Sequence, residues 1–107
     1  MKVNILLVNP KYTREYGFMS YDLNIELNKK IHFDKYDKVY SYKEEDIQYD
    51  NCITLNEIYE RFQNGVDMIY PTPVDYKNRS LSVGDIIQLD NKSYYIDSFG
   101  FKELIDY

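Results

Sequence analysis

The sequence predicts an α+β domain in which a small antiparallel or mixed sheet, with a C-terminal β-hairpin, packs against one main helix at about residues 54–64. Three observations predict this class. Short runs of β-branched and aromatic residues recur along the chain, one segment has a clear helical period, and no repeat or linker interrupts them. In a chain of 107 residues a second core would leave each half near the size at which disulfides or metals become necessary for folding, so we expect a single domain over residues 1–107.

The first expected strand is KVNILLV, residues 2–8, which is Leu-rich and β-branched and alternates weakly. Asn9-Pro10 ends it, because proline lacks the N–H that would extend a ladder. Residues 11–19 are expected to form a loop or an irregular turn around Gly17.

Two patterns compete at residues 20–30. Ser20 in an N-cap position and Asp22 in the first turn favour a helix. An alternating set of apolar residues favours a strand instead, namely Tyr21, Leu23, Ile25 and Leu27. We predict a short helix here and leave the conflict open.

Residues 37–43, DKVYSYK, are expected to form a second strand. The clearest helix follows at TLNEIYERFQNG, where Thr54 and Glu57 have capping-box spacing and Gly65 stands where a helix stops. Its apolar residues fall on one face at steps of three and four: Leu55, Ile58, Tyr59 and Phe62.

After a proline-containing loop at residues 66–80, the hairpin is expected at residues 85–98. In it Asn91-Lys92 supply the turn, and Gly100 breaks the second strand before the closing FKELIDY. Of Asp85 and Asp97, one is expected to cap a turn and the other to point out from a strand.

Composition restricts the class of function. Thirteen basic and eighteen acidic residues give a formal net charge of −5, so binding to nucleic-acid phosphates is not expected. The single cysteine excludes an intrachain disulfide, and the first residues have neither a signal-peptide core nor the length of a membrane span. We therefore expect a cytoplasmic protein that does not contact a membrane.

Few residues could carry chemistry. His32 is the only histidine, so a multi-histidine metal site is excluded, and the four glycines lack the spacing of a phosphate-binding loop. Cys52 precedes the capping box, and a Cys52–His32 nucleophile pair is conceivable. A lone cysteine is more often a small buried hydrophobe, so we expect no enzyme, no cofactor and no metal site.

One segment combines acidic and aromatic residues. YSYKEEDIQYD, residues 40–50, contains three tyrosines and four carboxylates that we expect to be unpaired, which together we call the acidic strip: Tyr40, Tyr42, Glu44, Glu45, Asp46, Tyr49 and Asp50. Such a strip can contact the Lys and Arg of a DNA-accepting groove. Alternatively it is an ordinary exposed loop, and many of the thirteen tyrosines simply fill strands.

The order of several blocks resembles the YodL-like domain, a small family found in Gram-positive bacteria and often on their mobile elements. The blocks are FMSYD at 18–22, YDKVYSY at 36–42, TLNEIYERFQ at 54–63, RSLSVGDII at 79–87 and SYYIDSFGFKEL at 93–104. The last two are the most specific. One departure is Tyr76, which stands where the family's usual proline-x-aspartate-phenylalanine lead has phenylalanine.

The resemblance implies a fold and carries over no catalytic residue. Small acidic proteins of mobile elements often block host defences, so the leading hypothesis is a non-enzymatic inhibitor of the anti-CRISPR or anti-restriction type. Its acidic strip would bind the basic groove of a nuclease effector. The alternative is an accessory domain that pairs with itself or with a larger mobile-element protein through a sheet edge, at the hairpin 85–98.

Overall fold

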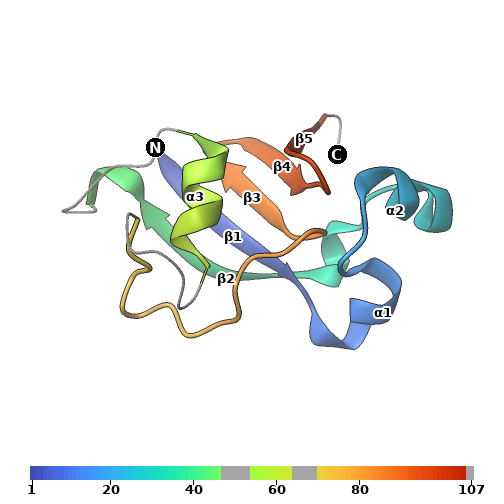
Figure 1. Ribbon diagram of the computed structural model, residues 1–107, viewed down its shortest axis with the longest axis horizontal. Coiled ribbons are helices and arrows are strands. Elements are labelled where there is room, and N and C mark those ends of the chain that lie inside the picture. The colour runs from blue at the N-terminus through green and yellow to red at the C-terminus, as the bar shows by residue number, and fades with distance from the viewer. Residues whose placement is uncertain (47–53, 64–69, 106–107) are drawn as a thin grey trace.

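The computed structural model describes residues 1–46, 54–63 and 70–105, and in these segments the chain forms one five-stranded sheet with three short helices (Figure 1). The strands are β1 Lys2–Val8, β2 Tyr36–Lys43, β3 Ile86–Leu89, β4 Lys92–Ile96 and β5 Phe101–Leu104. The helices are α1 Thr13–Tyr16, α2 Tyr21–Asn28 and α3 Leu55–Arg61, with 3-10 turns at Pro10–Tyr12, Phe33–Lys35 and Glu44–Asp46. The α+β class is confirmed, and every strand pair is antiparallel.

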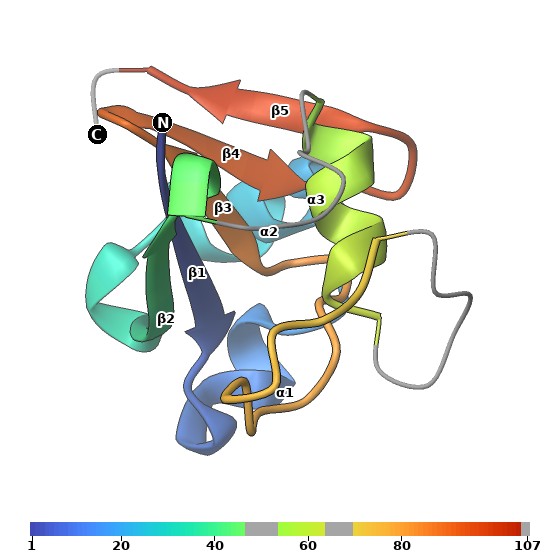
Figure 2. The ribbon, with the colours of Figure 1, turned by 90° about the vertical axis from the view of Figure 1, so that its left-hand side faces the viewer.

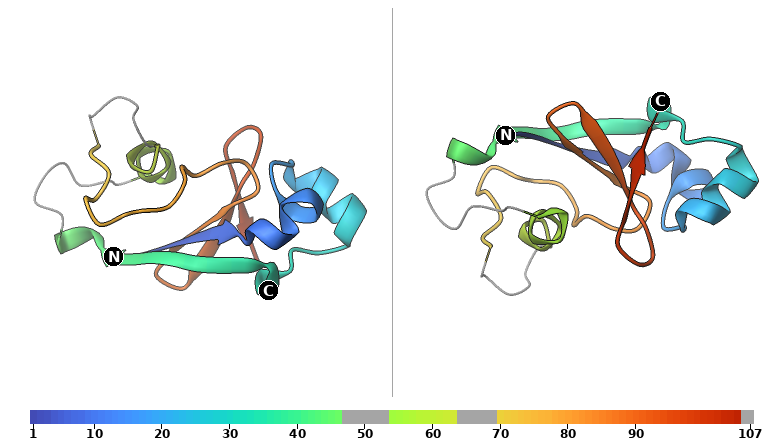
Figure 3. Two further views of the ribbon diagram at one scale, coloured as in Figure 1. Left: turned by 90° about the horizontal axis from the view of Figure 1, so that it is seen from below. Right: turned by 90° about the horizontal axis from the view of Figure 1, so that it is seen from above.

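The strand order is β2-β1-β3-β4-β5, and β1 is buried on both faces. Every residue from Val3 to Val8 is at most 8% exposed. Val3, Ile5 and Leu7 contribute to a core shared with α3, whereas Leu6 and Val8 contribute to a second core on the opposite face. α3 covers one face of the sheet, and α1 and α2 lie at one end of the molecule, where they close the second core (Figures 2 and 3).

The capping box of α3 is confirmed. Thr54 accepts a hydrogen bond from the Glu57 N–H, and the Glu57 side chain accepts one from the Thr54 N–H. Ile58 and Phe62 are fully buried in the first core, together with Ile87 and Ile96 of the sheet. The expected stop at Gly65 lies outside the described residues.

The short helix predicted at residues 20–30 is present as α2. The signals at its N-terminus therefore outweigh the alternation of apolar residues, which favoured a strand. The Ser20 hydroxyl accepts from the Leu23 N–H, and the Asp97 carboxylate accepts from the Tyr21 N–H. The buried side of α2 carries Asn24, which is fully buried and donates to the Tyr95 hydroxyl at 3.1 Å. Two members of the alternating set are exposed instead, Leu23 and Leu27.

The C-terminal segment differs from the expectation in two ways. The hairpin turn is Asp90-Asn91, one residue earlier than predicted, because Asp90 adopts a φ of 55° and its N–H donates to the Lys2 carbonyl. A further strand, β5, follows Gly100 and pairs with β4, so the segment is a three-stranded meander.

The expected pairing edge at residues 85–98 is wrong. β3 is hydrogen-bonded to both β1 and β4, and β4 is hydrogen-bonded to both β3 and β5, so neither strand of this hairpin has a free edge. The edges of the sheet among the described residues are β2 and β5. The β-strand addition hypothesis therefore has to use one of those two strands.

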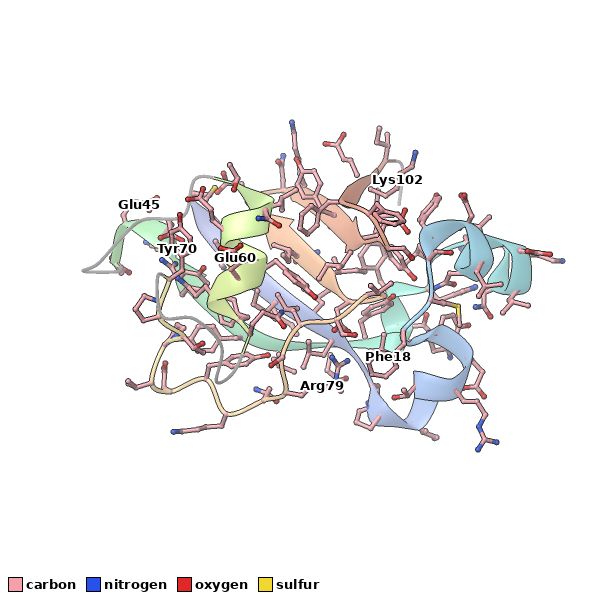
Figure 4. The ribbon with its side chains drawn as sticks, viewed as in Figure 1. Phe18, Glu45, Glu60, Tyr70, Arg79 and Lys102 are labelled. Carbon is pink, nitrogen blue, oxygen red and sulfur yellow. The ribbon has the colours of Figure 1, made fainter. Side chains whose placement is uncertain are left out.

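Asp85 joins three segments at the end of β1. Its carboxylate is 1% exposed and accepts from the Val8 N–H at 3.0 Å, the Ser82 N–H at 2.9 Å and two guanidinium nitrogens of Arg79 at 2.7 and 2.8 Å. The Arg79 guanidinium also lies over the Phe18 ring, with 5.6 Å to its centroid (Figure 4). Hydrogen bonding to Asp85 raises the pKa of Arg79.

Asp97 also binds turn amides, since it accepts from the Ser98 N–H as well as from Tyr21. The expectation that one of Asp85 and Asp97 points out from a strand is wrong, because β3 begins after Asp85 and β4 ends before Asp97.

We expect Asp85→Asn to lower the free energy of unfolding by about 3 kcal/mol, because it leaves Arg79 without its charge partner and places an amide donor against backbone N–H groups. The measurement is a urea unfolding curve. The matched control is Asp34→Asn, which changes an exposed carboxylate paired with Lys35 and is expected to leave the midpoint almost unchanged. Equal midpoints for D85N and the unaltered chain would contradict the role assigned to Asp85.

Candidate interaction surface

The acidic strip begins on β2 and continues into the 3-10 turn Glu44–Asp46, at the end of the molecule where Glu45 lies in Figure 4. The structure describes five of its seven members. Tyr49 and Asp50 lie outside the described residues.

Glu44 is structural. It is 4% exposed, and both of its carboxylate oxygens accept from Nη1 of Arg61, at 2.8 and 3.0 Å. Arg61 is itself fully buried on α3, three residues after Ile58, and the Tyr42 hydroxyl also donates to Glu44 at 3.3 Å. The expectation that Glu44 is unpaired is therefore wrong, because α3 brings a buried cation to it.

Tyr40 and Tyr42 extend the first core. The Tyr40 ring meets Tyr76 edge-on at 5.6 Å between centroids, and both Tyr40 and Tyr42 lie about 6 Å from Phe62, at 6.0 and 5.9 Å. The Tyr40 hydroxyl donates to Asp75 at 2.6 Å. Burial, followed by this hydrogen bond, raises the pKa of Tyr40 to about 12. Both rings are half-buried, so their packing accounts for much of their surface.

Glu45 and Asp46 are the exposed acidic residues of the strip within the described segments. Glu45 forms an ion pair with the N-terminal amine of Met1, and the hydrogen bond to that amine lowers the pKa of Glu45. The remaining surface of the strip is therefore smaller than the sequence pattern indicated.

His32 has structural contacts. Its Nε2 lies 3.1 Å from the Asn28 carbonyl oxygen, and its ring meets Tyr16 edge-on at 5.8 Å. Cys52 lies outside the described residues, so the structure describes no Cys52–His32 pair. No group of three or more His, Cys, Asp or Glu side chains that could hold a metal ion occurs within residues 1–46, 54–63 and 70–105.

The turn between β4 and β5 presents a surface feature that sequence reasoning missed. Phe99 is 96% exposed at its tip. The turn is closed by a hydrogen bond from the Asp97 N–H to the Gly100 carbonyl at 3.0 Å, and the Asp97 carboxylate accepts from Ser98 at 2.8 Å. Gly100 has a φ of 75°, which favours glycine. The available signal was the tyrosine-rich block ending in DSFGF, where a large apolar residue stands between two turn-forming ones.

A shallow pocket lies next to this turn. It has a volume of about 220 Å³ and is formed by α3 and the residues around Phe99. Tyr59, Ile96 and Phe101 provide its apolar surface, and Asn56, Asp97 and Ser98 provide its polar groups. The Tyr59 and Phe101 rings meet edge-on at 6.3 Å, which joins the helix to β5 at this point.

Comparison with known proteins gives one match. The family model described as the YodL-like domain matches residues 2–107. Neither a curated protein nor a solved structure matches the chain. Among the described residues, none of the helices has both the length and the apolar character needed to cross a bilayer.

The roles of Glu44 and Glu45 can be separated by a matched pair of variants. We expect Glu44→Gln to lower the free energy of unfolding by about 3 kcal/mol, because the buried Arg61 then loses the negative charge of Glu44. Glu45→Gln removes the same charge from an exposed neighbour and is expected to leave the urea midpoint almost unchanged. If both variants unfold at the midpoint of the unaltered chain, Glu44 does not stabilise the fold.

Proposed function

The chain belongs to the YodL-like domain family, and from this premise we propose that it is a non-catalytic protein-binding module whose main contact is the β4–β5 turn. The single observation that carries the proposal is Phe99, an aromatic side chain 96% exposed on a turn closed by hydrogen bonds. Aromatic side chains bury about 150–250 Å² each and dominate the energetics of protein interfaces.

The rigidity of the turn strengthens this argument. The Asp97 carboxylate accepts from both the Ser98 and the Tyr21 N–H groups, so it ties the turn to the first residue of α2. A side chain that is held in place before binding loses less conformational freedom when a partner covers it. The hydrogen bonds hold the backbone of this turn, so Phe99 has two properties of an anchor residue: it is large, and the backbone that carries it is fixed before binding.

The neighbouring pocket gives the same surface a complementary shape. Phe99 protrudes beside a hollow in which Tyr59, Val83 and Phe101 are partly accessible. A protein partner could cover Phe99 with an apolar patch and insert a side chain of its own into this hollow. Binding energy in protein interfaces is concentrated in such central apolar contacts.

The state of the buried charges supports a non-catalytic role. Asp85 is saturated by Arg79 and two backbone N–H groups, and Glu44 is paired with Arg61. Groups engaged in this way hold segments together and are not free to exchange protons with a substrate. These contacts favour a function carried by the surface.

A second, more specific form of the proposal is the anti-CRISPR or anti-restriction inhibitor. It is favoured by the exposed Glu45 and Asp46 at the end of β2, together with the net charge of −5. In this form the two carboxylates steer the module toward a protein with a basic, DNA-accepting surface. Glu44 has no part in that contact, because it is buried against Arg61.

The sheet-edge alternative uses β2 or β5. β2 carries Asp37, Lys38 and Lys43, and its register with β1 shifts between Ile5 and Leu6. Charged side chains and register irregularities are features that prevent edge-to-edge pairing. β5 is only four residues long. Self-pairing through an edge is therefore the less favoured candidate.

We expect Phe99→Ala to lower the amount of at least one captured protein about tenfold or more, because it removes the anchor. The measurement is quantitative mass spectrometry of proteins retained from a Gram-positive bacterial lysate by immobilised chain. The control is Val74→Ala, which alters a residue that is 90% exposed outside the turn. If F99A and V74A retain the same proteins in the same amounts as the unaltered chain, the turn is not the contact.

For a protein captured in this way, the inhibitor form predicts that Glu45→Gln with Asp46→Asn slows association about threefold or more and flattens its salt dependence. Association rates are measured by biolayer interferometry at low and high salt. The control pair is Asp22→Asn with Glu26→Gln, which removes the same charge from the exposed side of α2. Equal effects of both pairs would indicate a general charge effect and contradict a role for Glu45 and Asp46.

A further inference from the structure

Four of the five strand lysines lie on one face of the sheet, and the fifth, Lys92, lies on the α3 face next to Glu103. On the face opposite α3 the strands carry Lys2, Lys38, Lys43 and Lys102, which we call the lysine face. Their positions follow from the register, because Lys2 pairs with Lys43, Lys38 with Leu6, and Lys102 with Tyr95 of the second core. The acidic residues within the strands, Asp37 and Glu103, pair with residues of the other face, so no strand residue of the lysine face is acidic. Asp90, in the turn after β3, lies next to this face and accepts from the Lys2 N–H at 2.9 Å.

A row of polar side chains runs across four strands between these lysines. The Ser41 hydroxyl donates to the Asn4 amide oxygen at 2.7 Å, Asn4 Nδ2 donates to Gln88 Oε1 at 3.1 Å, and Gln88 Nε2 donates to Ser93 Oγ at 3.1 Å. The row follows the register from β2 through β1 and β3 to β4. It is therefore a continuous feature of the sheet surface.

The direction of these hydrogen bonds leaves donors available. Each amide uses its oxygen and one of its two N–H groups within the row. The second N–H of Gln88 and the hydroxyl hydrogen of Ser93 have no partner among the described residues, and both side chains are half-exposed. The surface therefore combines positive charge with hydrogen-bond donors, and both favour an anionic acceptor.

No helix of the described segments covers this part of the sheet, near Lys2, Lys43 and the polar row. α3 and the described segment after it lie on the other side, and α1 and α2 lie at the far end of β1 (Figure 3). Lys2 and Lys43 stand opposite each other near the start of β1, and neither forms an ion pair with a described residue. Like charges directly opposite in a sheet are destabilising, so an anion bound between them would relieve a repulsion.

We propose that the lysine face binds a carboxylate-rich segment of a partner protein, as a second contact of the protein-binding module. The charge argument allows carboxylates or phosphates, and the composition of the polar row favours carboxylates. The open row contains only Asn, Gln and Ser, and the strand rings of this face, Tyr36 and Tyr95, are buried, so the row itself offers no exposed ring that could stack on nucleic-acid bases.

The test uses the ¹⁵N-labelled chain, titrated with poly-L-glutamate and, separately, with an oligothymidylate of equal charge number. We expect poly-L-glutamate to shift the Gln88 side-chain amide signals and the backbone signals of Ser41 and Ser93. We expect Lys2→Gln, Lys38→Gln, Lys43→Gln and Lys102→Gln combined to weaken binding about tenfold, because four of the charges that attract the carboxylates are gone. The control combines Lys11→Gln, Lys29→Gln, Lys30→Gln and Lys77→Gln, which remove the same charge from helix ends and loops.

Several results would overturn the inference. Equal or tighter binding of the oligothymidylate would show a phosphate surface, and equal weakening by both lysine variants would show a general charge effect. Absence of shifts would remove the site, and shifts that appear on concentrating the chain alone would show that the face binds a second copy. The inference rests on the proposed protein-binding function, but its failure can be told apart from a failure of that function. Phe99→Ala is expected to leave poly-L-glutamate binding unchanged while it abolishes capture through the turn.

Discussion

The fold depends on one buried carboxylate. Asp85 accepts hydrogen bonds from the end of β1, from the turn that precedes β3 and from Arg79, so it joins the first strand to the C-terminal meander across most of the sequence. The chain is close-packed at this point, because a Cβ atom on Gly84 would lie 3.0 Å from the Phe18 N atom, and Gly84 has a φ of 99°. The block RSLSVGDII therefore corresponds to a structural junction. Arg79, Ser82 and Asp85 form the ion pair and the turn, and Leu81 is 2% exposed in the first core.

The high tyrosine content has a related physical cause. Residues 70–85 contain no regular secondary structure, so their carbonyl groups need partners from elsewhere. Tyr36 donates to the Gly84 carbonyl at 2.6 Å, and Tyr76 donates to the Arg79 carbonyl at 2.7 Å. The Tyr95 hydroxyl donates to the Met19 carbonyl at 2.7 Å. Burial raises the pKa of Tyr76 and of Tyr95 to about 12 and raises the pKa of Tyr36 further, so these hydroxyls remain donors throughout the neutral range. Phenylalanine would fill the same space and leave the carbonyls unsatisfied.

Features encoded by neighbouring residues were predictable from the sequence, and features that depend on distant contacts were not. The cap and apolar face of α3, the end signals of α2 and the strand β1 all lie within a few residues of each other, and all three elements are present. β5 was missed because a strand of four residues that directly follows a glycine has too little pattern to be recognised, although Leu104 is buried. Glu44 was misinterpreted for the same reason, since its partner Arg61 lies 17 residues away on a helix whose orientation no local pattern gives. Phe99 was overlooked because the signal that predicts a turn does not predict how far its side chains project.

These contacts also determine where function can reside. Glu44 and Asp85, which the sequence alone would allow to bind a partner, form buried ion pairs with arginines. Most of the tyrosines discussed above pack in the cores or donate to groups inside the protein. The remaining surface features arise from geometry. The closed turn projects Phe99 into solvent, and the two-residue period of the strands places Lys2, Lys38, Lys43 and Lys102 on one face, whereas the strand carboxylates and Lys92 lie on the other. A chain with a net charge of −5 that nevertheless presents such a face has an uneven field, and an uneven field orients a partner before contact. Orientation by charge and anchoring by a fixed aromatic residue are separable steps of binding, so one small domain can assign them to different surfaces.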